Sequence, residues 1–183
     1  MLVLRQELAL LLTVLVCSLA AYTDLRRGII PNRLVLIYAA VSCAMHGALA
    51  ALDSPSAALS ALGYCLLGML FCAIFPCLLY ALKSLGGGDL KLLIAIGACL
   101  GPQLGFQLQA YAYVLGSLYA LVRVVYRGTL WKTTVASAAS VMNPLLPRSL
   151  KKSAPVEALS TMHFAPAVCA SALLTIVLQW GLR

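Results

Sequence analysis

Long apolar stretches alternate with short polar ones along the whole chain. A helix that crosses a bilayer needs about 20 mostly apolar residues in a row, and soluble domains rarely carry such stretches. The pattern therefore predicts an all-α polytopic membrane protein with six transmembrane helices. These are expected over residues 7–23, 33–52, 57–82, 89–101, 104–125 and 164–181.

The fourth predicted helix is shorter than the others. Residues 89–101 would rise only about 20 Å at ~1.5 Å per residue, which is less than the thickness of a hydrocarbon core. Three glycines precede it and a Gly-Pro pair follows it, so we expect it to begin within the bilayer region or to cross a thin one. The four-residue spacing of Gly97 and Gly101 permits close packing against another helix.

The charges indicate how the chain is oriented. Hydrophobic residues make up 63% of the 183 positions and charged residues only 10%, with a net charge of +8. The cations lie between apolar stretches instead of on one folded face, which argues against a nucleic-acid partner. Eleven of the 13 Lys and Arg residues fall on the side of the connections 24–32, 83–88 and 126–163. By the positive-inside rule these connections face the cytoplasm and both termini lie outside.

The sequence indicates one membrane-embedded domain over residues 1–183, with a cytoplasmic or interfacial loop at about 126–163. A short helix lying in the interface near residues 129–142 is one possibility within that loop. The seven cysteines all lie in apolar stretches, and no C-x-x-C pair occurs. A free cysteine in such a stretch usually behaves as a small hydrophobic residue, so neither a metal nor another cofactor is expected.

Two of the five acidic residues stand out, because both fall at predicted helix ends on the cytoplasmic side. Asp24 lies where the helix dipole disfavours a negative charge, and Asp89 directly follows the three glycines. Each also has a structural interpretation: Asp24 as a solvated partner of Arg26 or Arg27, and Asp89 as the N-cap of its helix. The remaining acids are interpreted as surface or turn residues: Glu7, Asp53 and Glu157.

Two carboxyl groups at the same membrane depth suggest acid–base chemistry. Close to each other they cannot both ionise easily, so one acts as a neutral acid and the other as a base. Such a pair can activate water for attack on a peptide carbonyl. The glycines would let the backbone approach an extended substrate. Asn32 is expected mainly as the N-cap of the second helix, with Pro31 shaping the turn, and His46 as an interhelical hydrogen-bond partner.

Three motifs resemble one family of membrane proteases. Gly86-Gly87-Gly88-Asp89 with Lys91 is similar to the G-x-G-D-x-K motif of the G-x-G-D aspartic membrane proteases. Asp24 with Arg26, followed by Ile30-Pro31-Asn32, resembles the first-aspartate motif of the type IV prepilin peptidase branch. The segment from His163 to Ala167, which contains Pro166, is similar to that branch's aromatic-small-Pro signature.

The resemblance, most like the compact Flp/Tad-type members, implies a leader peptidase of the cytoplasmic (inner) membrane. It would remove a short basic leader from type IV prepilins or pseudopilins at the cytoplasmic face, cutting after a glycine and before an apolar helix. Asp24 and Asp89 would be the catalytic pair. Further motif residues would line the substrate cleft: Gly86, Gly87, Gly88, Lys91, Pro31, Asn32 and Pro166.

Larger members of the family add a cytoplasmic segment with paired C-x-x-C motifs and an N-methylation activity. This sequence lacks that segment, so methyl transfer is not expected. The alternative hypothesis is a small polytopic transport or pilus-assembly subunit whose aspartates have structural or ion-conducting roles.

Overall fold

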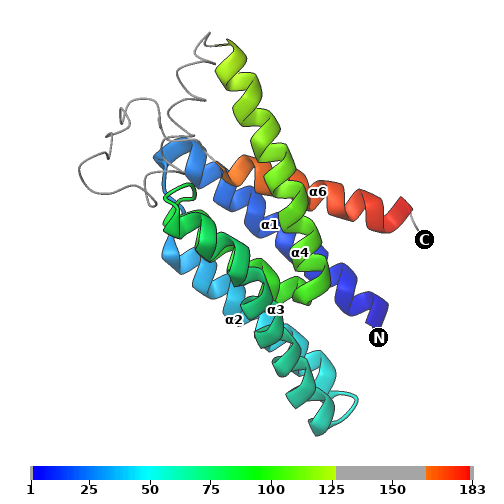
Figure 1. Ribbon diagram of the computed structural model, residues 1–183. Coiled ribbons are helices and arrows are strands. Elements are labelled where there is room, and N and C mark those ends of the chain that lie inside the picture. Colours follow the sequence, from blue (N-terminus) through cyan, green and yellow to red (C-terminus); the bar gives the residue numbers. More distant parts are fainter. Residues whose placement is uncertain (1, 127–163, 182–183) are drawn as a thin grey trace. The chain divides into compact units, whose positions relative to one another are not determined.

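The computed structural model describes residues 2–126 and 164–181 (Figure 1). This part of the chain is helical and contains no strand, which confirms the predicted all-α class. The predicted loop at 126–163, except for its first residue, and its interfacial helix lie outside the described residues. The helices are α1 (Leu2–Arg27), α2 (Asn32–Ala51), α3 (Pro55–Ala81), α4 (Gly87–Tyr126) and α6 (Ala165–Gly181).

The chain divides into two units. The first comprises Met1–Leu115 and His163–Arg183, and the second comprises Gly116–Met162. The described part of the second unit is the end of α4, which is helical as far as Tyr126. All the predicted site residues belong to the first unit. In that unit α6 packs mainly against α1, and α2 packs mainly against α3.

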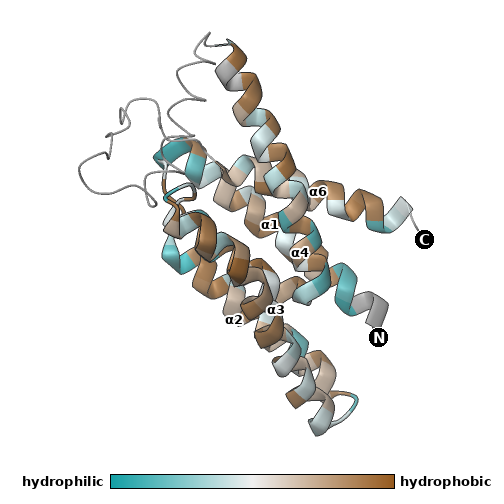
Figure 2. Cartoon of the chain, in the orientation of Figure 1, coloured by the Kyte–Doolittle hydropathy of each residue, from teal (hydrophilic) through white to brown (hydrophobic). Residues whose placement is uncertain are grey.

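Among the described residues, four helices are long and apolar enough to cross a membrane, and α6 is a shorter apolar helix. Figure 2 shows hydrophobic residues along most of the length of these helices. Large apolar side chains also face outward, and Leu67 and Leu70 are 60% and 67% exposed. Such exposure is expected where a helix meets lipid tails instead of water. The described residues thus support a multi-pass membrane protein.

A break divides α4 at the predicted boundary between the fourth and fifth helices. Gly101 has φ 75° and ψ −177°, in the left-handed region that glycine tolerates. Pro102, which has no backbone N–H, follows it and cannot continue the hydrogen-bond ladder. The ring of Tyr64 occupies the space where a Cβ of residue 101 would lie. The first arm, residues 87–100, rises only about 21 Å, in agreement with the predicted short helix.

Helices α3 and α4 touch through their backbones. A Cβ built on Gly68 would lie only 2.0 Å from the carbonyl oxygen of Gly97, and one built on Gly97 would lie 2.3 Å from that of Gly68. A Cβ on Gly105 would in turn lie 3.2 Å from the Cα of Gly97, so the two arms of α4 approach each other closely. The predicted close packing at Gly97 and Gly101 is therefore confirmed.

A side chain of α4 supplies a hydrogen bond that α3 cannot make itself. Pro76 lies inside α3 and has no N–H, so the carbonyl of Cys72 loses its usual intrahelical donor. The Nε2 atom of Gln109 donates to that carbonyl at 2.8 Å and also to the carbonyl of Leu93 at 3.3 Å. Gln109 is only 1% exposed. An interhelical bond thus satisfies a backbone group that would otherwise be unpaired within the bundle.

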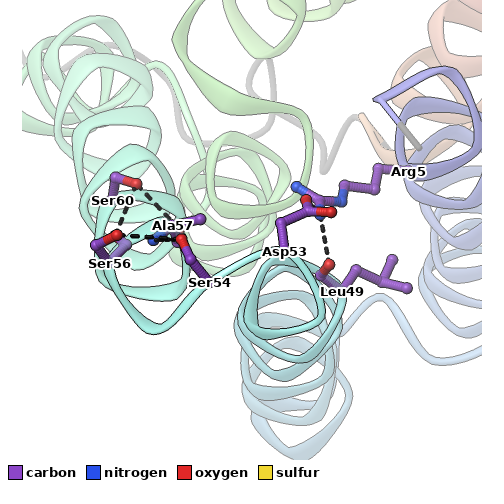
Figure 3. A network of polar contacts seen from close by, with 7 residues as sticks. All are labelled: Arg5, Leu49, Asp53, Ser54, Ser56, Ala57 and Ser60. Carbon is purple, nitrogen blue, oxygen red and sulfur yellow. Dashed lines mark hydrogen bonds and ion pairs between the residues drawn. The ribbon is translucent and has the colours of Figure 1, made fainter.

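The end of α1 farthest from Asp24 is tied to the α2–α3 connection (Figure 3). Arg5 forms an ion pair of 2.5 Å with Asp53 and donates a hydrogen bond to the carbonyl of Leu49. Asp53 lies in the predicted turn, but the sequence did not reveal its partner. Ser54 caps α3 by accepting a hydrogen bond of 3.1 Å from the amide of Ala57. These contacts satisfy polar groups at the end of α2 and at the start of α3.

Candidate active site

Asp24 lies in the last turn of α1, as predicted. The helix ends because Gly28 adopts φ 64°, and the amide of Gly28 donates to the carbonyl of Asp24 at 2.7 Å. The Asp24 side chain is buried, with a relative exposure of 8%. Its Oδ2 atom has no hydrogen-bond partner among the described residues. The interpretation of Asp24 as a solvated partner of the neighbouring arginines is therefore wrong. Arg26 instead lies over the ring of Tyr22, 4.9 Å from its centroid.

Asp89 lies in the first turn of α4, in the third helical position. The amide of Leu90 donates to the carbonyl of Gly86 at 3.0 Å, so the glycine precedes the helix. The interpretation of Asp89 as the N-cap is thus wrong, because Gly86, three residues earlier, holds that position. A Cβ added to Gly86 would lie 3.0 Å from Oδ2 of Asp89, so a side chain there would crowd the carboxylate. The Oδ1 atom is buried and has no hydrogen-bond partner in the described part of the chain.

The fold brings the two carboxyl groups within electrostatic range of each other. Their repulsion falls when one of the two binds a proton, so the pair favours a state with one acid and one carboxylate. Each carboxyl also has one buried oxygen that has no hydrogen-bond partner among the described residues. Buried polar atoms are normally satisfied, and those that are not are frequent where a ligand, water or reacting group binds.

Two contacts join the α1–α2 connection to the segment that carries Asp89. A Cβ on Gly88 would lie 3.2 Å from the Cβ of Ile30, which is 6% exposed. On the other side of Asp89, the Nζ of Lys91 donates to Oδ1 of Asn32 at 3.0 Å. Sequence reasoning missed both contacts, and the only signal for the first was an apolar residue before a proline in a polar connection.

The N-cap role predicted for Asn32 is wrong. Helix α2 begins at Asn32 itself, so Pro31 occupies the N-cap position, and no side chain caps the helix. The Asn32 side chain is instead the acceptor for Lys91, as described above. Pro31 keeps its predicted place in the turn, with the extended backbone (φ −63°, ψ 128°) that proline favours. The second glycine of the motif, Gly87, lies against the ring of Tyr80 from α3.

An apolar groove of about 310 Å³ adjoins these residues. Lys91 and Asn32 line it together with side chains of α2, α3 and the first arm of α4. Its apolar lining consists of Val35, Leu36, Ala39, Met69, Ile94 and Ala95. The groove thus includes Lys91, which is two residues from Asp89 in the chain, and apolar side chains of the three helices.

Pro166 lies in the first turn of α6, where a missing N–H leaves no helical hydrogen bond unmade. The amides of Ala167 and Val168 both donate to the carbonyl of Phe164. The Phe164 ring stacks on that of Tyr113, with centroids 6.0 Å apart, and Tyr113 in turn packs against Phe75 at 5.5 Å. The aromatic-small-Pro segment therefore anchors the start of α6 to α3 and α4, and the predicted cleft role of Pro166 stays a prediction. His163 lies outside the described residues.

The described residues contain no group of three or more His, Cys, Asp or Glu side chains that could hold a metal ion. His46 is an interhelical hydrogen-bond partner, as predicted, with its Nε2 atom 2.7 Å from the carbonyl oxygen of Cys99 on α4. All seven cysteines are free, and four of them are buried: Cys17, Cys65, Cys72 and Cys99.

Comparison with known proteins identifies similar sequences. The sequence model of the type IV leader peptidase family matches residues 11–121, a stretch that includes both Asp24 and Asp89. Prepilin peptidase EppA from Methanothermobacter thermautotrophicus is 30% identical over 103 residues, which cover 51% of this chain and 23% of that protein. The alignment with this chain thus spans about a quarter of that relative's length. No solved structure matched the chain.

Proposed function

This chain belongs to the type IV leader peptidase family, and from that premise we propose that it is a membrane-embedded aspartic endopeptidase. Its substrates are type IV prepilins or pseudopilins, of the Flp type, with a short basic leader followed by an apolar helix. It cuts after the glycine that ends the leader, at the cytoplasmic face of the inner membrane, and transfers no methyl group. The observation that carries the proposal is the pair Asp24 and Asp89, each with a buried oxygen that no described residue satisfies.

The proposed reaction is a general acid–base hydrolysis. One aspartate is ionised and takes a proton from a water molecule, whose oxygen attacks the carbonyl carbon of the scissile peptide. The other aspartate is protonated and polarises the carbonyl oxygen by donating a hydrogen bond. As the C–N bond breaks, the amide nitrogen takes the proton that the first aspartate accepted from water and leaves as the new amino terminus, which restores that aspartate to its ionised form. The buried oxygen of each carboxyl lies in low-dielectric surroundings, which strengthen both interactions.

The positions of the glycines support binding of an extended substrate. A side chain at residue 86 would crowd the carboxylate of Asp89, which lies one helical turn farther along. With hydrogen at this position, the carboxylate keeps room for a peptide backbone beside it. The other two glycines of the motif face Tyr80 and Ile30, so they serve mainly the packing of the segment.

We propose the apolar part of the precursor as the occupant of the groove beside Lys91. In such a precursor the apolar helix directly follows the cut, so its first residues must lie close to the two aspartates. The groove includes Lys91, two residues along the chain from Asp89, and is otherwise lined almost entirely by aliphatic side chains, which match an apolar helix. The precursor would then enter sideways from the lipid, with its leader at the cytoplasmic interface.

The proposal is tested by co-expression with a precursor that carries a basic leader, a glycine and an apolar helix. Asp24→Asn and Asp89→Asn each keep the shape of the side chain and remove the acid, so each should leave the precursor unprocessed. Asp53→Asn is the matched control, because this aspartate pairs with Arg5 at the other end of α1. It should process the precursor as the unchanged protein does. Normal processing by both test variants would favour a transport or assembly subunit.

A further inference from the structure

Resting on the proposed function, we infer that Lys91 and Asn32 are positioning residues, which together with the Ile30–Gly88 contact hold Asp24 and Asp89 in register. Asp24 and Asp89 lie on different helices, α1 and α4, and no described hydrogen bond joins their side chains. Their relative placement therefore depends on how the helices pack and on the segments next to the two residues. Those segments are joined at two points, one on each side of Asp89.

The first point is a packing contact. Ile30 is buried and belongs to the connection that begins four residues after Asp24 at Gly28. Its Cβ lies where only a hydrogen atom on Gly88 leaves room, since an added Cβ would be 3.2 Å away. The absence of a side chain at Gly88 lets the Ile30 side chain pack close to the backbone of the α4 segment, and packed interiors transmit small displacements. The segment before Asp89 therefore follows the connection after Asp24.

The second point is the hydrogen bond of 3.0 Å from Nζ of Lys91 to Oδ1 of Asn32. Asn32 is the first residue of α2, and Lys91 lies in the turn of α4 that starts with Asp89. Residues two positions apart on a helix point to different faces, so Lys91 is turned away from Asp89. Its ammonium group is thus engaged by Asn32, and it acts on the carboxyl pair through the backbone.

The packing contact lies on one side of Asp89 and the hydrogen bond on the other, so together they limit both the rotation and the translation of this residue. A single joint would leave the first turn of α4 free to pivot, and helix ends fray readily without a partner. With both in place, movement of the Asp89 backbone relative to the α1–α2 connection disturbs the packing at Ile30 or lengthens the hydrogen bond, which joins two exposed side chains. Displacements of about 1 Å at a reacting group can reduce turnover by up to ~100-fold.

The test is the steady-state kinetics of purified protein in lipid vesicles, with a synthetic precursor of the design given above. Lys91→Met keeps the aliphatic stem and removes the donor, and Asn32→Leu keeps the size and removes the acceptor. Each should lower kcat about 10-fold or more, a larger change than the one in KM, to which both side chains contribute because they line the groove, and the pH profile should be unaltered. Lys91→Arg, which retains a donor, should restore part of kcat. The matched control is Arg33→Met, which removes an exposed cation next to Asn32 and should leave kcat unchanged.

The double variant Lys91→Met with Asn32→Leu should be no slower than the slower single variant, because the two substitutions remove the same hydrogen bond. Independent, multiplying losses would overturn the inference. A shifted pH profile would also overturn it, because Lys91 would then act through its charge on the carboxyl pair. Wild-type kcat in both single variants would do the same.

A measurement without catalysis separates this inference from the proposed function. In hydrogen–deuterium exchange of the intact protein in vesicles, both variants should speed exchange in peptides covering residues 28–34 and 86–92, while the exchange in α6 stays unchanged. If the unchanged protein fails to cleave the precursor, the proposed function fails, and exchange still decides whether the two segments are joined. Unchanged exchange in both variants would refute the inference that the Lys91–Asn32 hydrogen bond holds the two segments together.

Discussion

Gln109→Leu should destabilise the fold, and the loss should depend on Pro76. In the present structure Gln109 donates to the Cys72 carbonyl, which has no intrahelical donor because residue 76 is proline. Leucine removes that donor and leaves a buried carbonyl unpaired. In a Pro76→Ala background, the new backbone amide of residue 76 donates to the same carbonyl, so the loss of Gln109 should matter less.

The expected magnitude follows from the contacts. An unsatisfied buried acceptor costs about 1–3 kcal/mol, and interhelical hydrogen bonds in membrane proteins contribute about 0.6 kcal/mol on average, rarely more than ~1.7. Gln109 makes one short bond and one of 3.3 Å, and its own Oε1 is buried with no described partner. Leucine removes this unsatisfied oxygen as well, which offsets part of the loss. We expect a net loss of about 1–2 kcal/mol from Gln109→Leu and a coupling with Pro76→Ala of about 1 kcal/mol.

The assay is a double-mutant cycle of unfolding free energies in mixed detergent micelles, followed by far-UV circular dichroism. Gln107→Leu is the matched control, because Gln107 lies in the same arm of α4 but is exposed. It should change the unfolding free energy by less than about 0.5 kcal/mol. An equal loss from Gln109→Leu with and without the Pro76→Ala substitution would refute the reasoning, because the side chain would then stabilise the fold independently of the missing amide.

Three further predictions concern other parts of the first unit. Gly97→Ala should reduce the amount of folded protein recovered from membranes, measured by size-exclusion chromatography in detergent, because its Cβ would lie 2.3 Å from a backbone oxygen of α3. Replacing Arg5 by Met and Asp53 by Asn, singly and together, should show a coupling of no more than about 1 kcal/mol in unfolding experiments. The coupling should shrink in high salt, since the Asp53 side chain is 50% exposed. Ala39→Phe should fill the groove and raise KM for the precursor several-fold with little effect on kcat, whereas Ala40→Phe, on an exposed position, should not.

Sequence patterns predicted the elements well, because each depends on local chemistry. Apolar stretches mark helices wherever the surroundings are lipid or protein interior, so all five labelled helices of the described chain were located. The break in α4 follows from Gly101 and Pro102, of which one adopts a backbone conformation that other residues avoid and the other lacks an N–H. The approach of α3 and α4 at Gly97 needs only the absence of a side chain.

The aspartates of the candidate site were also found from sequence, because carboxyl groups are few in a chain that is 63% hydrophobic. An ionisable group in such surroundings is costly, and this rarity points to function without knowledge of the fold. The motifs placed both at helix ends, which the structure agrees with. The burial of Asp24 and the electrostatic interaction between the two carboxyls, however, depend on how the helices pack and are not encoded in any short segment.

Partners distant in sequence were decided only by the tertiary structure. Asn32 has the features of an N-cap, yet its oxygen binds Lys91, 59 residues away. Asp53 has the features of a turn residue, yet its carboxylate pairs with Arg5, and Gln109 bonds to a carbonyl that Pro76 left free. A local pattern states which groups need a partner, since polar groups cannot remain unpaired in a bilayer. Which partner each one finds depends on helix packing, because only packing brings groups from separate helices within about 3 Å.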